Sequence, residues 1–197
     1  MITKNAWFCN SDTSSYPCFK IIPLCNLLIN SCLEEAISKL HQIVTERKGE
    51  PKINDIILEE LRKMAASLGF SAEFRYWVLL CGLFNIKEDP SGRNILKCWK
   101  DHEKAFLALV TQDGKIGIKH LLQAIIMYFT SRYAAEMSKF ASTFMKMLVC
   151  DQEVFAEEFI IKWFNRKAKL DKACVLYDRK AEKAFRGLIE AFVNWLQ

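Results

Sequence analysis

Residues 118–129, IKHLLQAIIMYF, are the stretch that decides the fold. Their apolar side chains recur three and four residues apart, which is the spacing that places them on one face of an α-helix. The stretch therefore predicts an amphipathic helix with a nearly continuous apolar stripe. The stripe consists of Ile118, Leu121, Leu122, Ile125, Ile126 and Phe129.

Seven other segments show the same spacing, and none alternates with the two-residue period of a β-strand. The low content of four prolines and seven glycines also argues against an all-β fold, which needs many turn residues. The sequence therefore predicts an all-α chain of about eight helices, whose short links favour antiparallel, stacked pairs. The seven segments are 33–44, 54–68, 71–81, 95–110, 137–148, 155–163 and 181–195.

Local signals mark the expected helix ends. Ser31 and Glu34 form a capping box, which predicts that the first helix starts there. We therefore expect residues 1–32 to be a poorly structured N-terminal arm and residues 33–197 to be one domain. Residues 85–94, NIKEDPSGRN, predict a loop. The other end signals are Gly49, Gly69, Ser71 and Gly114.

Composition and charge are those of an ordinary globular domain, with 197 residues, 51% apolar residues and a net charge of +5. The basic residues are spread along the chain, so no direct nucleic-acid partner is expected. Lys20 and Pro23 interrupt the apolar run at 19–32, and no cleaved secretory signal is expected. No stretch approaches the ~20 apolar residues that span a bilayer. We expect a cytoplasmic protein with no membrane partner.

The eight cysteines form no CxxC pair and have no zinc-ligand spacing with the three histidines, His41, His102 and His120. We therefore expect reduced thiols, and neither a metal nor a cofactor. The cysteines lie at positions 9, 18, 25, 32, 81, 98, 150 and 174.

The motifs of common enzyme classes are missing from the sequence. It contains no GxxxxGK[ST], GxGxxG, HExxH or GxSxG. Glu157 and Glu158 are paired acids, but adjacent residues of a helix do not face each other. We expect no catalytic residue and no enzyme.

Residues 151–164, DQEVFAEEFIIKWF, place acids at the start of a segment whose other face is apolar. Acids are favoured at a helix N-terminus by ~0.3–1 kcal/mol each, so a helix start alone would explain them. The second interpretation is a surface that binds a partner protein. The acids are Asp151, Glu153, Glu157 and Glu158.

Together with AFRGLIEAFVNWLQ at 184–197, this stretch resembles the two aromatic–acidic boxes of the W-two domain family. That domain ends eukaryotic translation initiation factor 5, to which the likeness is strongest, and its mimic proteins. It also ends initiation factor 4 gamma and the epsilon subunit of initiation factor 2B. The likeness covers residues 33–197. The matching aromatic positions are Trp163 and Phe164 in the first box, and Phe192 and Trp195 in the second.

The resemblance implies a HEAT-like stack of antiparallel helical hairpins that acts as a non-catalytic protein-interaction platform in translation initiation. It also implies that an acidic edge binds the lysine-rich tail of the initiation factor 2 beta subunit, while other faces bind initiation factor 1 and the initiation factor 3 c subunit. Two alternatives stay open: guanine-nucleotide exchange, as in the epsilon subunit, and a helical adaptor outside translation. The expected binding residues are Asp151, Glu153, Glu157, Glu158 and Glu190.

Two features of the boxes carry further expectations. Trp163 and Trp195 are expected to pack between the last two helices rather than to contact a partner. Cys150 stands where the family has a tyrosine, and a run of basic residues between the boxes departs from the family pattern. This run weakens the expected acidic face. It consists of Arg166, Lys167, Lys169, Lys172, Arg179, Lys180, Lys183 and Arg186.

Overall fold

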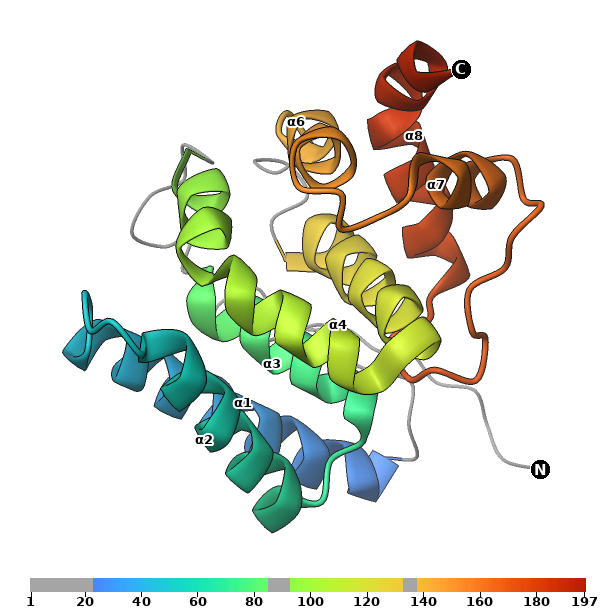
Figure 1. The fold of residues 1–197 in the computed structure, drawn as a ribbon. Helices are drawn as coiled ribbons and strands as arrows, with labels where there is room; N and C mark the ends of the chain where they lie inside the picture. Colours follow the sequence, from blue (N-terminus) through green and yellow to red (C-terminus); the bar gives the residue numbers. More distant parts are fainter. Residues whose placement is uncertain (1–22, 85–92, 133–137) are drawn as a thin grey trace, which may run out of the picture.

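The computed structural model describes residues 23–84, 93–132 and 138–197, and this part of the chain is helical with no strand (Figure 1). Seven α-helices and two short π-helical turns make up the described residues, which confirms the predicted all-α class. The elements are α1 (Pro23–Glu46), α2 (Ile53–Leu68), α3 (Ala72–Leu83), α4 (Arg93–Met127), η1 (Tyr128–Arg132), α6 (Ala141–Lys146), η2 (Met147–Asp151), α7 (Glu157–Phe164) and α8 (Arg179–Leu196).

Helices α1, α2 and α3 pack against one another in the N-terminal half. A Cβ atom added at Gly82 in α3 would lie 2.8 Å from Leu40 Cδ2 in α1, so only glycine permits this approach. Gly69 ends α2 in the left-handed conformation with φ 64°. The predicted ends at Gly69 and Ser71 are therefore confirmed, because α3 begins directly after Ser71.

Helix α4 bends at Gly114, where φ is 61° and ψ is −140°. The two helices predicted at 95–110 and 118–129 are the two halves of this kinked element. The kink is held to α3, because the Arg75 guanidinium lies 2.6 Å from Asp113 and the Tyr76 hydroxyl donates to the same carboxylate at 3.0 Å. The helix end expected at Asp113 and Gly114 is therefore a kink within α4.

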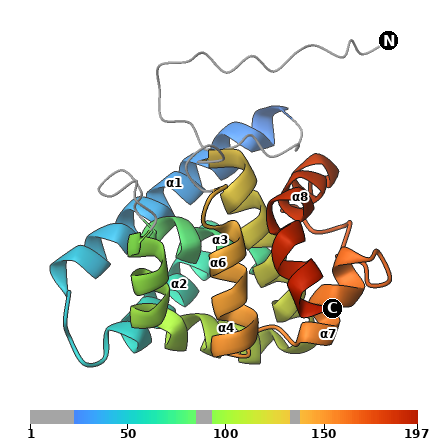
Figure 2. The same cartoon turned by 90° about the horizontal axis from the view of Figure 1, so that it is seen from above.

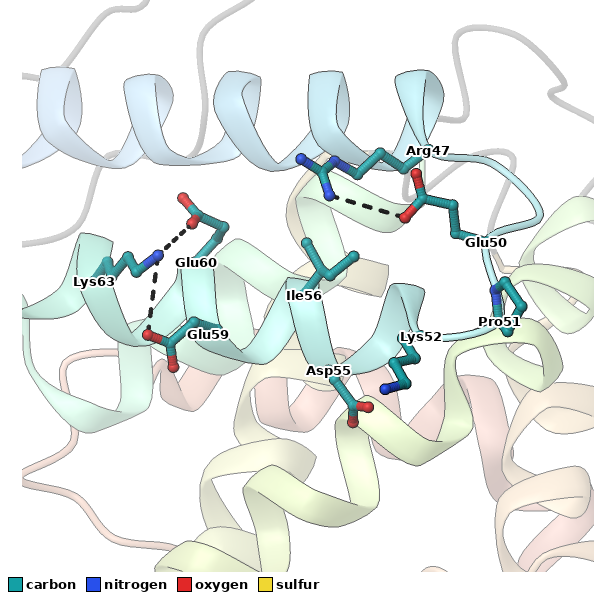
Figure 3. A pocket seen from close by; sticks show the side chains of 9 residues that line it. All are labelled: Arg47, Glu50, Pro51, Lys52, Asp55, Ile56, Glu59, Glu60 and Lys63. Carbon is teal, nitrogen blue, oxygen red and sulfur yellow. Dashed lines mark hydrogen bonds and ion pairs between the residues drawn. The ribbon is translucent and has the colours of Figure 1, made fainter.

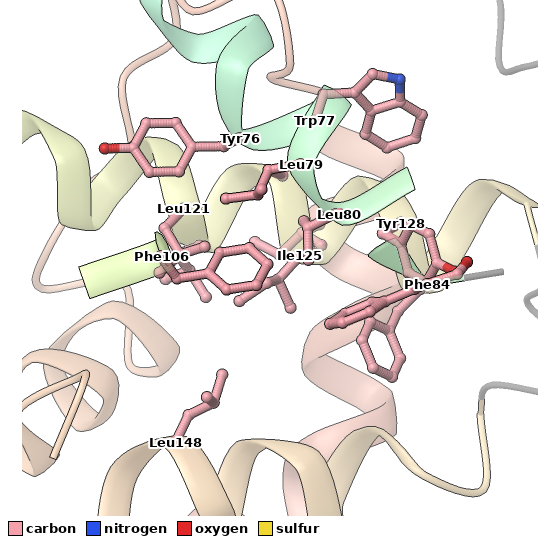
Figure 4. Close-up of a cluster of buried hydrophobic side chains, with 14 of the residues drawn as sticks. Tyr76, Trp77, Leu79, Leu80, Phe84, Phe106, Leu121, Ile125, Tyr128 and Leu148 are labelled. Atoms are coloured by element: carbon pink, nitrogen blue, oxygen red, sulfur yellow. The ribbon is translucent and has the colours of Figure 1, made fainter. Parts of the chain in front are cut away.

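The core is built around the apolar stripe at 118–129, and Figure 4 shows part of this core. Leu121, Ile125 and Phe129 are fully buried, as predicted. Rings from α6 and α8 pack on Phe129, with Phe144 and Phe185 at centroid distances of 5.2 and 5.8 Å. Within α4, the Trp99 ring stacks on Phe106 with centroids 4.2 Å apart. The other large buried rings include Trp77, Phe84 and Tyr128.

The C-terminal half consists of α6, α7 and α8, and Figure 2 shows α8 between α6 and α7. Helix α8 packs against α4, α6 and α7. It begins at Asp178, whose carboxylate accepts hydrogen bonds from the backbone N–H groups of Lys180 and Ala181. The segment predicted at 137–148 forms the shorter α6 followed by η2.

One prediction about the helix ends is wrong, and another falls outside the described residues. The capping box at Ser31 is wrong, because α1 begins at Pro23 and Ser31 lies inside it. Proline suits a first helical position, since its missing N–H would have no partner there. Residues 23–32 of the expected arm are therefore helical, whereas 1–22 lie outside the described residues. The predicted loop also lies outside them at 85–92.

Within the described ranges, no helix combines the length and apolar character needed to cross a lipid bilayer.

Candidate protein-binding site

The predicted binding acids lie where η2 turns into α7. Asp151 and Glu153 lie in this turn, Glu157 and Glu158 form the first turn of α7, and all four side chains are exposed. The Leu148 carbonyl accepts from the Val154 and Phe155 N–H groups at 2.8 and 3.3 Å, which reverses the chain direction. We call Asp151, Glu153 and Glu157 the acidic turn.

Buried apolar side chains anchor the acidic turn and α7 to the core. Val154 and Phe155 are buried, and so are Ile160 and Trp163 on the inner face of α7. The spacing from 160 to 163 is that of one helical face, and Glu158 lies opposite it. Glu157 is the first residue of α7 and is also exposed. The predicted amphipathic pattern of this stretch is confirmed.

Gln152 ties the acidic turn to α4. Its side-chain oxygen accepts a hydrogen bond from the Trp99 indole nitrogen. Its amide nitrogen donates to the Glu103 carboxylate at 2.8 Å. Since Gln152 lies between two of the three acids, these bonds hold the backbone of the acidic turn in place.

The four acids differ in whether they are already neutralised. The Glu158 carboxylate lies 2.6 Å from the Lys162 ammonium, and this hydrogen bond lowers the pKa of Glu158 below its usual value. Asp151, Glu153 and Glu157 form no ion pair with any residue in the described part of the chain. The acidic turn therefore presents three uncompensated negative charges.

The negative charges of Asp151 and Glu157 both act on the thiol of Cys150. Burial raises the pKa of its thiol, and the negative charges of Glu157 and Asp151 raise it further. Both carboxylates therefore lie within electrostatic reach of one sulfur atom, although five residues lie between them in sequence.

Trp163 packs between α7 and α8, as the sequence predicted. Its indole nitrogen donates to Glu182 at 2.9 Å, and the Arg186 guanidinium lies 4.8 Å from its ring centroid. Arg186 also pairs with Glu182 at 2.7 Å, and the Tyr177 hydroxyl donates to Glu182 at 3.1 Å. Sequence reasoning missed Glu182, although its position four residues before Arg186 is the spacing of a helical ion pair.

Trp195 is 62% exposed, so the expectation that it packs between the last two helices is wrong. The buried face of α8 includes Phe185, Ile189 and Phe192, and the next position on that face is Leu196. Trp195 lies one residue off this line. Its ring stacks beside Phe192 with centroids 6.3 Å apart, and the Lys146 ammonium lies 4.7 Å from it.

The remaining predicted site residues lie outside the acidic turn. Glu190 is exposed on α8 and belongs to a different element from the acidic turn. Phe192 is buried, and Phe164 is partly buried against the core. Of the four box aromatics, Trp195 alone is largely exposed.

A second surface feature is an open hollow of about 670 Å³ between α1 and α2 (Figure 3). Its charges neutralise each other: Arg47 pairs with Glu50 at 3.8 Å, and Lys63 pairs with Glu60 at 2.9 Å. The Lys63 hydrogen bond lowers the pKa of Glu60. The hollow offers no uncompensated charge cluster like that of the acidic turn. It is lined by Arg47, Glu50, Pro51, Lys52, Asp55, Ile56, Glu59, Glu60 and Lys63.

No group of three or more histidine, cysteine or acidic side chains gathers in a metal-binding arrangement within the described ranges. Comparison with known proteins gives no match to any family model, curated protein or solved structure.

Proposed function

We propose that this chain is a non-catalytic protein-interaction platform of cytoplasmic translation initiation, a W-two domain that binds lysine-rich segments of other initiation factors. The proposal rests on the resemblance of residues 151–164 and 184–197 to the two boxes of that family. By the same resemblance, its partners are the initiation factor 2 beta subunit, initiation factor 1 and the initiation factor 3 c subunit.

The observation that carries the proposal is the acidic turn. Asp151, Glu153 and Glu157 are exposed, form no ion pair with a described residue and sit on a backbone held by Gln152. Asp151 and Glu153 lie before the first turn of α7, beyond the range of its dipole, so a helix start does not account for them. Three free carboxylates on one fixed turn are suited to a multivalent cationic segment.

The order of helix contacts supports the HEAT-like part of the proposal. Alternate helices touch each other, as α1 touches α3, α2 touches α4, and α6 touches α8. Stacked hairpins produce this arrangement, because each hairpin buries its apolar face against the next one. We therefore infer a short, irregular stack of hairpins with the acidic turn at its C-terminal end.

Binding to lysines would be electrostatic and modest. Exposed ion pairs contribute about 0.2–1 kcal/mol each, and salt screens them over a Debye length of about 10 Å at 0.1 M. Glu158 adds little to this attraction, since Lys162 already neutralises it.

The experiment is calorimetric titration of the chain with a lysine-rich peptide of about twelve residues at low and high salt. The variant combines Asp151→Asn, Glu153→Gln and Glu157→Gln, which removes three charges without changing side-chain size. We expect about tenfold weaker binding at low salt, with a smaller difference at high salt.

The matched control combines Glu35→Gln, Asp55→Asn and Asp101→Asn, which are exposed acids on other helices. It changes the net charge equally and is expected to bind within about twofold of the parent chain. A triple variant of the acidic turn that binds the peptide as tightly as the parent chain would reduce these acids to a helix start.

A further inference from the structure

The segment between α7 and α8 runs along the edge of the molecule in both views (Figures 1 and 2). From residue 166 to residue 183, seven basic side chains are exposed, a density that no other described segment of this length reaches. We call them the basic edge. They are Arg166, Lys167, Lys169, Lys172, Arg179, Lys180 and Lys183.

The acids inside the same segment are occupied by internal hydrogen bonds. Asp171 accepts from the Ala173 N–H at 2.9 Å, and Asp178 caps α8. Glu182 accepts from Trp163, Tyr177 and Arg186. None of these carboxylates forms an ion pair with a residue of the basic edge, so its positive charge is uncompensated locally.

Several cations elsewhere in the described part of the chain, by contrast, are paired with acids. On α1 and α2, Lys39 and Lys63 both pair with Glu60, and Arg62 pairs with Glu59 at 2.6 Å. No residue of the basic edge forms an ion pair with any described residue. Arg186, which the sequence grouped with them, is paired with Glu182 and does not belong to the edge.

The basic edge is anchored to the core even though it is irregular. Leu170, Cys174 and Leu176 are buried beneath it. The Gln123 side-chain amide in α4 donates to the Asp171 carbonyl at 2.6 Å, and the Lys167 N–H donates to the Lys162 carbonyl at 2.7 Å. An anchored backbone presents its charges at defined positions, which reduces the ordering cost of binding.

We propose that the basic edge is a second interaction surface, opposite in charge to the acidic turn, that binds an aspartate- and glutamate-rich segment of a partner protein. Seven uncompensated cations on a fixed backbone complement such a segment, and no acid of the edge itself competes for them. This inference goes beyond the proposed function and does not depend on it.

The structure favours an acidic peptide over a nucleic acid for two reasons. Single-stranded nucleic acid is held by stacking on exposed aromatic rings, but Trp163 is buried and Tyr177 is partly buried against the core. The acidic turn lies at the opposite end of α7, whose eight residues span only about 12 Å. That distance is close to a Debye length, so the turn repels a long polyanion more than a short peptide.

The test measures fluorescence anisotropy of a labelled twelve-residue glutamate-rich peptide on the full chain at two salt concentrations. The variant combines Lys167→Glu, Lys169→Glu and Lys172→Glu. The matched control combines Lys97→Glu, Lys100→Glu and Lys104→Glu, three exposed lysines on α4 that form no ion pair with a described residue. Circular dichroism confirms that both variants keep their helix content.

We expect the basic-edge variant to bind the acidic peptide at least about tenfold more weakly at low salt, and the control to stay within about twofold. Equal loss in both variants would show attraction to overall charge alone and overturn the proposal. So would unchanged binding in the basic-edge variant. Tighter, lysine-dependent binding of an oligonucleotide of matched length would replace the acidic peptide with a nucleic acid.

The neutralised acidic-turn variant separates this proposal from the proposed function. It should keep full affinity for the acidic peptide while losing affinity for the lysine-rich one. Loss of both affinities in that variant would show one shared site and contradict the assignment of two surfaces.

Discussion

The indole nitrogen of Trp163 donates a 2.9 Å hydrogen bond to the carboxylate of Glu182, which also pairs with Arg186 at 2.7 Å. This contact joins α7 to α8. The side chains of Glu182 and Arg186 are only 14% and 15% exposed, so the pair is largely removed from water. The first box is therefore held in place by Glu182, which lies outside both boxes, and by Arg186 of the second box.

Glu182→Gln should destabilise the chain by about 2–3 kcal/mol, because the Arg186 charge then stays partly buried without a counter-charge. Urea denaturation followed by circular dichroism measures the change. Glu158→Gln is the control, since it also removes one partner of a helical ion pair but at an exposed site, and it should leave the free energy of unfolding nearly unchanged. Equal effects would contradict the structural role of Glu182.

Trp163→Ala should reduce the free energy of unfolding by about 3–5 kcal/mol, since the side chain is fully buried. Trp195→Ala should change it by less than about 1 kcal/mol, because most of that ring already contacts water. The same denaturation experiment compares both. If Trp195→Ala proved as destabilising as Trp163→Ala, the exposed position of Trp195 would be wrong.

His102 should make the chain less stable in mild acid. Burial lowers the pKa of this histidine, while the nearby charge of Asp101 opposes the shift, and its Nδ1 lies 3.0 Å from Asn54 Oδ1. Below the unfolded pKa of about 6.5, the unfolded chain binds the proton more readily than the folded one. Stability is therefore lost as the pH falls from about 6.5 towards the lowered folded pKa.

The measurement is the free energy of unfolding at about pH 7 and pH 5. His102→Gln, which cannot gain this proton, should lose less stability over that interval than the parent chain. Parallel losses in both proteins would remove His102 as a source of the acid sensitivity.

The thiols of Cys98 and Cys174 should react slowly with iodoacetamide in the folded chain. Burial raises the pKa of each to about 12, so at pH 8 only about one thiol in 10⁴ is ionised. Both are free, and so is the partly exposed Cys32, which should be labelled faster than either of them. Mass spectrometry of the labelled peptides over time distinguishes them. Labelling of Cys174 as fast as Cys32 would show that its loop opens readily.

Much of the fold could be predicted from the sequence, because helix formation depends on neighbours three and four residues away. The stripe at 118–129 and the ends of α2 at Ile53 and Gly69 are set by such local patterns. The exposure of Glu158 follows from the same periodicity, since it lies opposite the apolar face of α7.

Other features depend on contacts between distant segments, which a single sequence does not reveal. Arg186 reads as one more surface cation, yet its pairing with Glu182 beside Trp163 removes it from the surface charge. Trp195 reads as a second packed tryptophan, yet Leu196 occupies the next position on the buried face of α8.

The sequence by itself determined the helical class, most helix positions and the amphipathic faces, because these follow from local spacing and turn chemistry. The tertiary structure alone decided which charges remain free. Asp151 and Glu157 stay uncompensated while Glu158 is neutralised, and the basic edge stays unpaired while Arg186 is not. Charge pairing depends on distances across the folded chain, and electrostatic energy falls with those distances rather than with separation in sequence.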